Sequence, residues 1–474
     1  MIATSAIAVS RRAPQATDLP DSPAPTWRRG DGFALAVALA LIAVAAVVGH
    51  EMNRRGLPIV LPRPPLLAFW HPHLGWGTPL AILSVLLGVR LQQVAAVLPW
   101  RRLLLAGWLL NLAWMCSLTL VDGLQRGWID VLLDPNEYLH DLHRIADPWT
   151  FLSSFTHFIA FGPGVGGDLV WTTHVAGHPP LATLIFWLLG GVGLSGGFWA
   201  GALCILVGSA TSVAMPTTLR ELGAEAAGRR IVPFIALFPG AVWMAVSADG
   251  LFAGVAVGGL ALVCIGARRG RILASLAGGL LLGIAVFLSY GLVLFGLVVL
   301  PAMLLTVRQQ ASRSVLVPWL IATIGFVAVA AVHLALGFNW VSGLVALRIR
   351  YYQGIASQRP FSYFVYADLA AWLVSCSPLL AIGVARSVAV LSKGHTGPWT
   401  QDRIVALLAL SGVIAALIAD FSALSKAETE RIWLSFGLIA YSGLALLRGR
   451  RATWALAMSA AWALLVNHLL NTGW

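Results

Sequence analysis

Residues 103–121 read LLLAGWLLNLAWMCSLTLV, a run without a single charge, and Asp122 follows the run directly. About 20 apolar residues in a helix cross the ~30 Å hydrocarbon core of a bilayer. The stretch therefore predicts a membrane-spanning helix. Arg101 and Arg102 precede the run, and basic residues in short loops favour the cytoplasmic side. Asp122 is therefore expected where this helix leaves the membrane on the outer side.

The composition indicates that similar runs make up most of the chain. Of the 474 residues, 59% are hydrophobic and only 11% are charged. Soluble proteins carry about 25% charged residues. The net charge of +12 is explained by basic residues on short cytoplasmic loops, so no nucleic-acid partner is expected. The cysteines lie within apolar runs, which favours packed thiols over disulfides or a metal site: Cys116, Cys204, Cys264 and Cys376.

Threading the chain by the positive-inside rule predicts an all-α polytopic protein of the plasma membrane with about 13 spans. The N-terminus is expected in the cytoplasm and the C-terminus outside. The expected spans are residues 33–49, 78–99, 103–121, 197–216, 231–247, 250–267, 272–289, 290–307, 315–336, 363–385, 403–421, 432–447 and 452–470.

The same threading divides the chain into three parts. Residues 1–31 are expected to form a disordered cytoplasmic tail, residues 32–100 a transmembrane hairpin, and residues 101–474 the main domain. The division depends on residues 179–189 forming a juxtamembrane or re-entrant helix. A crossing there would move every later basic loop to the outer side.

The long outer loop, residues 122–196, contains an unusual share of the acids and histidines of the chain. They are Asp122, Asp130, Asp134, Glu137, Asp141, Asp147, Asp168, His140, His143, His157, His174 and His178. Membrane proteins avoid charged side chains unless these are solvated or functional. Because acids contribute little to topology, their concentration on one side favours an enzyme that works at the outer face.

Two acids of this loop are candidate catalytic residues. A carboxylate at the membrane surface, such as Asp122, is partly desolvated and can act as a general base. The other interpretation of Asp122 is a simple helix-end anchor. Asp134 and Pro135 predict a turn into a short helix that carries Glu137, which we take as the second catalytic candidate, with Asp134 binding substrate. The alternative is a solvated amphipathic helix on the membrane.

His178-Pro179-Pro180-Leu181 is the more specific histidine motif, because two prolines fix the start of the helix that follows. We expect His178 to contact substrate at the end of the acidic loop. The histidine spacings do not match a known metal motif, and no HExxH occurs. No metal is therefore expected as a cofactor, and a divalent metal remains the alternative.

Two later outer segments contain candidates for binding a lipid-linked phosphate, because the arginine fork matches phosphate oxygens and keeps its charge. The donor-binding candidates are Arg348, Arg350, Arg359 and Arg431, and further substrate-binding candidates are Tyr352, Glu430 and Asp249, the last at a tight outer turn. The alternative for the arginines and tyrosines is ordinary contact with lipid head groups in an aromatic belt.

Together these features resemble the GT-C superfamily of membrane glycosyltransferases. That superfamily includes protein O-mannosyltransferases, the catalytic subunit of oligosaccharyltransferase and the aminoarabinose transferase of lipid A. Residues 134–139, 351–360 and 428–434 look like stretches of actinobacterial envelope-glycan transferases, such as mannosyl- and methylthioxylosyl-transferases. The resemblance covers roughly residues 100–447. It departs from the family at Gly123, where many members have a second acid, so the identity of the second acid stays open.

The resemblance implies transfer of a sugar from a polyprenyl-phosphate donor to a cell-envelope glycan or lipoglycan at the outer face, with inversion at the sugar. Asp122 would take the proton of the acceptor hydroxyl, and the arginines named above would stabilise the leaving phosphate. One alternative is a transporter or flippase of lipid-linked sugars, which would be expected to place charges at mid-membrane on broken helices. Another is a structural subunit of an envelope complex.

Overall fold

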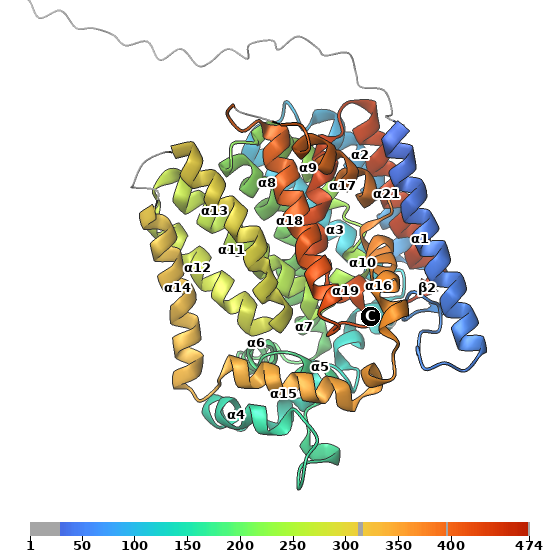
Figure 1. Cartoon of the computed structure of the whole chain (residues 1–474), viewed down its shortest axis with the longest axis vertical. Helices are drawn as coiled ribbons and strands as arrows, with labels where there is room; N and C mark the ends of the chain where they lie inside the picture. The colour runs from blue at the N-terminus through green and yellow to red at the C-terminus, as the bar shows by residue number, and fades with distance from the viewer. Residues whose placement is uncertain (1–28, 311–315, 395–396, 473–474) are drawn as a thin grey trace, which may run out of the picture.

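The computed structural model describes residues 29–310, 316–394 and 397–472, most of which are helical (Figure 1). Within these residues, nine helices are long and apolar enough to cross a membrane. They are α1 (Arg29–Arg54), α2 (Gly77–Val94), α3 (Trp100–Thr119), α7 with α8 (Gly197–Ser209 and Thr211–Glu221), α11 (Ala248–Arg269), η6 with α13 (Tyr290–Phe295 and Gly296–Gln310), α14 (Leu316–Ala335), α18 (Gln401–Phe421) and α21 (Arg450–Leu469). The chain is therefore an all-α multi-pass membrane protein, as its sequence predicts.

A tenth candidate span is sharply bent. α16 (Phe361–Cys376) and α17 (Leu380–Leu391) pass the same length and hydropathy test together, with a bend of 103° between them. The sequence predicts one straight span over residues 363–385. Pro378 explains the difference, because a proline disfavours helical geometry in the residue before it. That residue, Ser377, has a φ of 71°.

The other three predicted spans correspond to shorter or interrupted helices. α9 (Glu225–Ala236) and α10 (Ala241–Met244) are separated at Pro239, and α12 (Ile272–Leu288) has 17 residues. The third comprises α19 (Thr429–Ile432), α20 (Leu434–Tyr441) and η9 (Ser442–Leu446). The count of 13 crossings therefore stays a prediction.

The long loop, residues 122–196, folds into short helices at one end of the bundle. These are η1 (Gln125–Ile129), η2 (Val131–Leu133), η3 (Tyr138–Arg144), α4 (Pro148–Ser154), η4 (Phe155–Phe158), η5 (Gly167–Leu169), α5 (Thr173–Gly177) and α6 (Leu181–Gly191). At 1.5 Å per residue α6 is about 16 Å long, too short to cross a ~30 Å core. α15 (Trp340–Gln353) lies across the same end and leads into η8 (Ile355–Ser357) (Figure 1).

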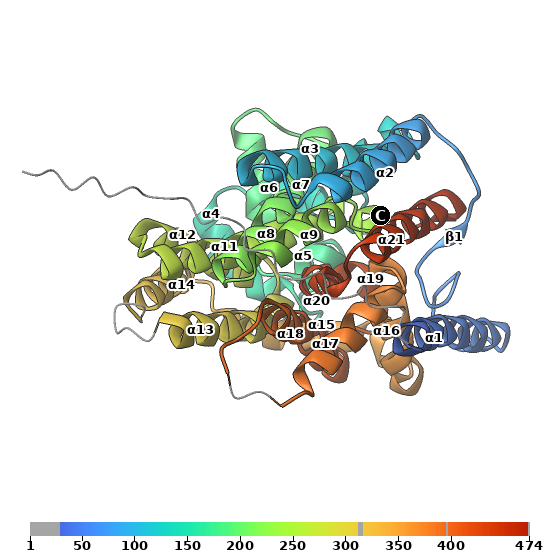
Figure 2. The same ribbon diagram turned by 90° about the horizontal axis from the view of Figure 1, so that it is seen from above.

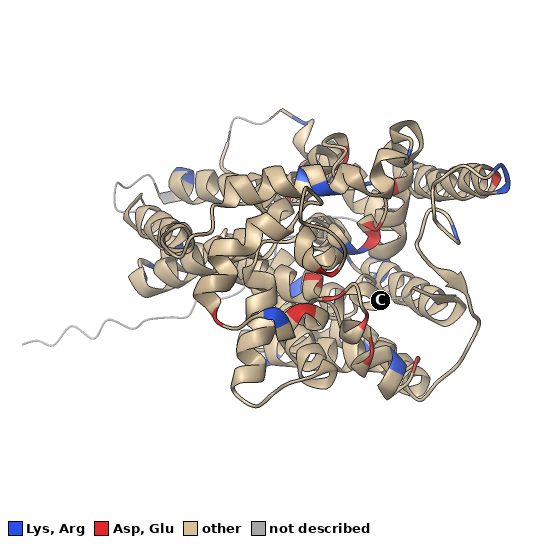
Figure 3. Cartoon of the chain, turned by 90° about the horizontal axis from the view of Figure 1, so that it is seen from below, with Lys and Arg blue, Asp and Glu red and all other residues tan. Residues whose placement is uncertain are grey.

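Ion pairs between distant segments fall into two groups, one at each end of the bundle. At one end, Arg269 pairs with Glu221, and Arg448 pairs with Asp402 at 2.9 Å. At the other, Arg431 pairs with Glu137 at 3.3 Å. Each pair joins residues that the threading places on the same side. Seen from below, several charged segments meet near the middle of the end that carries the long loop (Figure 3). Which end faces the cell interior stays a prediction.

The N-terminal helices pack into the body of the protein. α1 contacts α16 and α17, whereas α2 contacts α3 and α21, and the two stand apart in the view from above (Figure 2). A short antiparallel pair of β1 (Phe69–Trp70) and β2 (Leu470–Asn471) joins the segment between α1 and α2 to the C-terminus. Residues 32–100 are thus distributed over two faces of the bundle instead of packing as a hairpin.

The expected tail extends three residues too far. Residues 29–31 begin α1, and buried Asp31 accepts from Arg386 Nη2 at 2.6 Å and from Nε at 2.9 Å. Residues 1–28 of the predicted tail lie outside the described residues. A buried acid is costly unless it is paired, so this ion pair fixes the start of α1 against α17.

Candidate functional site

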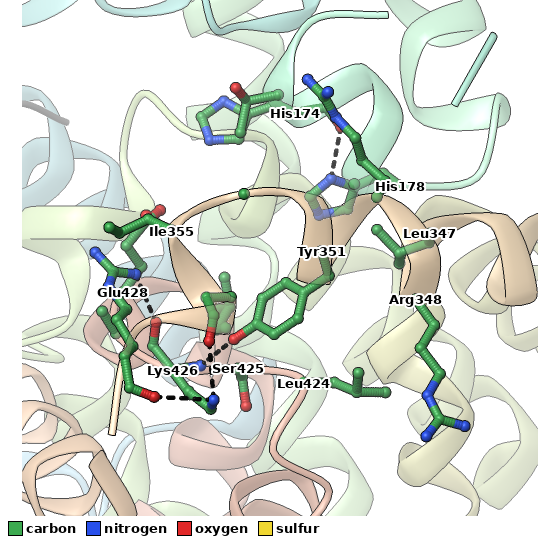
Figure 4. Close-up of a pocket in the computed structure, with 18 of the residues that line it drawn as sticks. His174, His178, Leu347, Arg348, Tyr351, Ile355, Leu424, Ser425, Lys426 and Glu428 are labelled. Atoms are coloured by element: carbon green, nitrogen blue, oxygen red, sulfur yellow. Dashed lines mark hydrogen bonds between the residues drawn. The ribbon is translucent and has the colours of Figure 1, made fainter. Parts of the chain in front are cut away.

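A cavity of about 460 Å³ lies where the long loop 122–196 meets α15 and the segment before α20. Its cationic lining residues come from two segments far apart in the sequence: Arg348, Arg350, Arg359, Lys426 and Arg431. His174 and His178 also line it, and Glu428 is the one carboxylate among its described lining residues. Figure 4 shows Arg348 on the opposite side of this cavity from Lys426 and Glu428. The structure thus brings the four predicted donor-binding arginines to one cavity.

The helical spacing of residues in α15 explains how they reach the cavity. Asn339 caps the helix by accepting from the Ser342 amide at 3.0 Å. Side chains three and four residues apart share a helix face. The cavity face carries Leu344, Leu347, Arg348 and Tyr351, and exposed apolar side chains elsewhere on the helix are Val341, Val345 and Ile349. Arg350 lies at the cavity with its guanidinium 3.9 Å from the centre of the Phe161 ring.

Arg431 is buried and is held by three acids. Nη1 lies 3.3 Å from Glu137 Oε1, Nε 3.3 Å from Asp249 Oδ2, and Nη2 3.4 Å from Glu428 Oε2. Burial alone would lower the pKa of Arg431, but Asp249, Glu137 and Glu428 outweigh it and raise the pKa. Arg431 is therefore a permanent charge with a fixed orientation.

His174 links Arg431 to Glu137. Its Nε2 lies 2.9 Å from Arg431 Nη2, and its Nδ1 lies 2.8 Å from Glu137 Oε1. A guanidinium can only donate, so Nε2 accepts and the ring proton sits on Nδ1, facing Glu137. Burial raises the pKa of Glu137, but His174 and Arg431 together outweigh burial and lower it. Glu137 is therefore an ionised carboxylate one layer behind the cavity wall.

The turn before η3 positions Glu137. Asp134 Oδ1 accepts from the Asn136 amide at 2.8 Å, and the Asn136 carbonyl accepts from the His174 amide at 3.0 Å. Thr173 Oγ1 donates to Asn136 Oδ1 at 3.0 Å. Asp134 is exposed and is not among the described residues that line the cavity. Its observed contacts are those of a turn residue, not of the substrate contact that we expected.

Lys426 and Arg359 hold each other in place. Arg359 Nη1 donates to the Lys426 carbonyl at 2.8 Å, and Lys426 Nζ donates to the Arg359 carbonyl at 3.0 Å. Arg359 Nε also donates to the Ile59 carbonyl at 3.1 Å. These bonds use much of the donor capacity of Arg359. Its side chain therefore forms part of the cavity wall. Lys426 was not among the residues selected from the sequence, although it lies in the same charged segment as Arg431.

His178 lines the cavity. Its Nδ1 donates to the His174 carbonyl at 2.9 Å, and its ring packs near Tyr138 and Phe252. Burial lowers the pKa of His178 to about 4, so the ring is neutral near pH 7.

Two other candidates lie off the cavity. Tyr352 is exposed and donates to the Ala423 carbonyl at 3.3 Å, whereas the neighbouring Tyr351 lines the cavity and accepts from the Lys426 amide at 2.7 Å. Glu430 is fully buried, which raises its pKa to about 7, and it is not among the described lining residues. Neither residue is placed for the substrate contact that the sequence suggested.

Asp122 lies at a different place. Its Oδ1 is 3.3 Å from His73 Nε2 and 3.9 Å from Arg126 Nε. It lines a smaller cavity with Trp243 and Asn467, and it is not among the described residues that line the arginine cavity. The structure therefore does not bring the first catalytic candidate to the predicted phosphate site.

No known protein family matches this chain, and no curated protein matches it. Within the described residues, no group of three or more His, Cys, Asp and Glu side chains is arranged to hold a metal ion.

Proposed function

We propose that the protein is a glycosyltransferase that moves a sugar from a polyprenyl-phosphate donor to a hydroxyl of a cell-envelope glycan or lipoglycan at the outer face of the membrane. The observation that supports this most strongly is the convergence of Arg348, Arg350, Arg359, Lys426 and Arg431 on one cavity. The leaving group of such a reaction is a lipid monophosphate, whose developing negative charge needs fixed cations.

The cations have different tasks. The three acids around Arg431 balance its charge, and Arg359 bonds to backbone carbonyls. Arg348 and Arg350 lie on the α15 side of the cavity, where Arg348 is exposed. We therefore assign the main phosphate contacts to Arg348 and Arg350, since a guanidinium pairs with two phosphate oxygens at once.

The position of α15 suits a substrate held in a bilayer. One side of this helix lines the cavity, and Val341, Val345 and Ile349 are exposed elsewhere on it. Exposed apolar side chains on a helix at the membrane interface are buried in the lipid. A phosphate on a lipid chain can then meet the cavity at the depth of its own head group.

A transporter of lipid-linked sugars is the second candidate, favoured by the bend of 103° between α16 and α17. Broken helices at mid-membrane hold substrates in many transporters. The cationic cavity, however, lies beside the loops at the end of the bundle. We therefore rank the transferase first.

One assay distinguishes the two candidates. The full-length protein, purified in detergent, is incubated with radiolabelled polyprenyl-phosphate hexoses and pentoses and with envelope glycan from a strain that lacks the protein. Label in the glycan supports the transferase. If the protein moves labelled lipid across proteoliposome membranes without labelling glycan, the transferase proposal is wrong. Linkage analysis of the same strain identifies the missing sugar.

A further inference from the structure

We propose that Glu428 is the general base that accepts the proton of the acceptor hydroxyl. This proposal rests on the proposed function, because it assigns a proton acceptor to a transfer reaction in the arginine cavity. It replaces Asp122, which lines a different cavity. Glu428 was not selected from the sequence, where it was one of several charges at the start of a span.

Accessibility separates Glu428 from the other acids at the site. Three carboxylates contact Arg431, and a base must also touch the substrate. The side chains of Glu137 and Asp249 are 4% and 10% exposed, whereas that of Glu428 is 30% exposed and lines the cavity. Glu428 is therefore the acid of this cluster that a hydroxyl can reach, and it lies across the same cavity from Arg348.

The backbone at this position is strained. Ala427 and Glu428 have φ angles of 77° and 63°, in the left-handed region that residues other than glycine rarely adopt. Such strain is concentrated at active sites, where surrounding bonds maintain it.

Bonds on both sides hold the strained turn. The Ala427 amide donates to Asp368 Oδ1 at 2.9 Å, and the Lys426 amide donates to the Tyr351 hydroxyl at 2.7 Å. Thr429 Oγ1 donates to the Asp368 carbonyl at 2.8 Å. The turn thus orients the Glu428 side chain toward the cavity at a fixed position relative to Arg431.

The proposed transfer step needs no reactant besides the donor and the acceptor. The oxygen of the acceptor hydroxyl forms a bond to the anomeric carbon of the donor sugar. The bond from that carbon to the phosphate oxygen breaks, and its electron pair stays on the phosphate. The hydroxyl proton passes to a carboxylate oxygen of Glu428, which later releases it to water. The products are the extended glycan and a polyprenyl phosphate.

The test compares two Glu428 variants with a distant control in the detergent assay described above. Glu428→Gln keeps the shape but not the basicity. Glu428→Gly tolerates the positive φ and leaves space for added formate. Glu225→Gln removes an exposed acid at the other end of the bundle, where it pairs with Arg229 at 3.0 Å. Melting temperatures establish that each variant is folded.

We expect kcat of Glu428→Gln to fall about 10²–10⁴-fold with little change in KM for the donor, because general-base catalysis contributes that much. Formate should restore part of the activity of Glu428→Gly, and Glu225→Gln should match the parent. Parental turnover by Glu428→Gln, or no restoration of folded Glu428→Gly by formate, overturns the base assignment alone. If the parent transfers sugar from none of the donors, the proposed function fails, and the base assignment fails with it.

Discussion

Arg431 Nη1 and Glu137 Oε1 lie 3.3 Å apart although the two residues are 294 positions apart in the chain. The contact is buried, and it ties the long outer loop to the segment that enters the last part of the bundle. Because His174 touches both partners, the loop is fastened at η3 and again at α5. The cavity wall therefore depends on this cluster being intact.

Replacing Glu137 with Gln should destabilise the protein. The change removes one charge-assisted bond from Arg431 while Asp249 and Glu428 remain, so the expected loss is about 1.5–3 kcal/mol. The measurement is the melting temperature in detergent. The matched control is Glu51→Gln, which removes an exposed acid paired with Arg54 at 3.2 Å and Arg55 at 2.8 Å. Equal melting temperatures for the two variants would show that the Glu137 cluster does not stabilise the loop.

The phosphate site can be tested with Arg348→Lys and Arg350→Lys. Each keeps the positive charge but loses the fork that pairs with two oxygens. Loss of one charge-assisted bond of about 1.4 kcal/mol or more should raise KM for the lipid donor at least about tenfold. Arg126→Lys, on the outer loop near Asp122, is the control. Unchanged donor KM in both variants would identify these arginines as head-group anchors.

The pH dependence of stability reports on His178. Its pKa in the folded protein is about 4, below the ordinary 6.5, so between these values the unfolded chain binds a proton that the folded protein does not. His178 therefore contributes a loss of stability as the pH falls from 6.5 toward 4, whereas Glu430, whose pKa is raised to about 7, contributes a gain in parent and variant alike. On going from pH 7 to pH 5, the melting temperature of the parent should therefore fall more, or rise less, than that of His178→Asn. The lowered pKa of Glu137 affects stability only below pH 4.5, outside the measured range from pH 7 to pH 5. Identical pH curves would mean that the His178 ring is not desolvated.

The sequence predicts most of the helices because length and hydropathy are local properties of a segment. The run 103–121 corresponds to α3, and the expected juxtamembrane helix corresponds to α6. The bend at Pro378 was missed, although Ser-Pro is a local signal for it.

The assembly of the site depends on how the spans pack, and hydropathy does not contain that information. The sequence selected the four arginines by residue type, but it did not predict that Glu137, Asp249 and Glu428 would surround Arg431. Tyr351 and Tyr352 are adjacent and alike in the sequence, so the sequence offered no ground for preferring Tyr351 to Tyr352. The orientation of α15 decides which of them reaches the cavity.

Cysteine labelling tests the threading. In a cysteine-free background, single cysteines at Asp134 and Ser357 should react with an impermeant reagent added to intact cells, because both are exposed at the predicted outer end. Cysteines at Glu225, whose side chain is 43% exposed, and at exposed Gly394, both at the opposite end, should react only after permeabilisation. Labelling of position 225 in intact cells would invert the predicted orientation of the cavity and exclude an outer-face reaction.

Asp122 is the base that the family resemblance implies. Asp122 pairs with His73 and Arg126 and lines a small cavity with Trp243 and Asn467. A donor bound at Arg348 and Arg350 needs a base that lines its own cavity, and Glu428 meets that condition. Asp122→Asn keeps the shape and hydrogen-bonding capacity of the side chain, so it should stay folded and lose less than about tenfold of its kcat, below the 10²–10⁴-fold expected for loss of a general base. The measurement is sugar transfer by Asp122→Asn beside Glu428→Gln in one preparation. If Asp122→Asn is inactive while Glu428→Gln transfers sugar, Asp122 is the base and the acceptor enters through the smaller cavity.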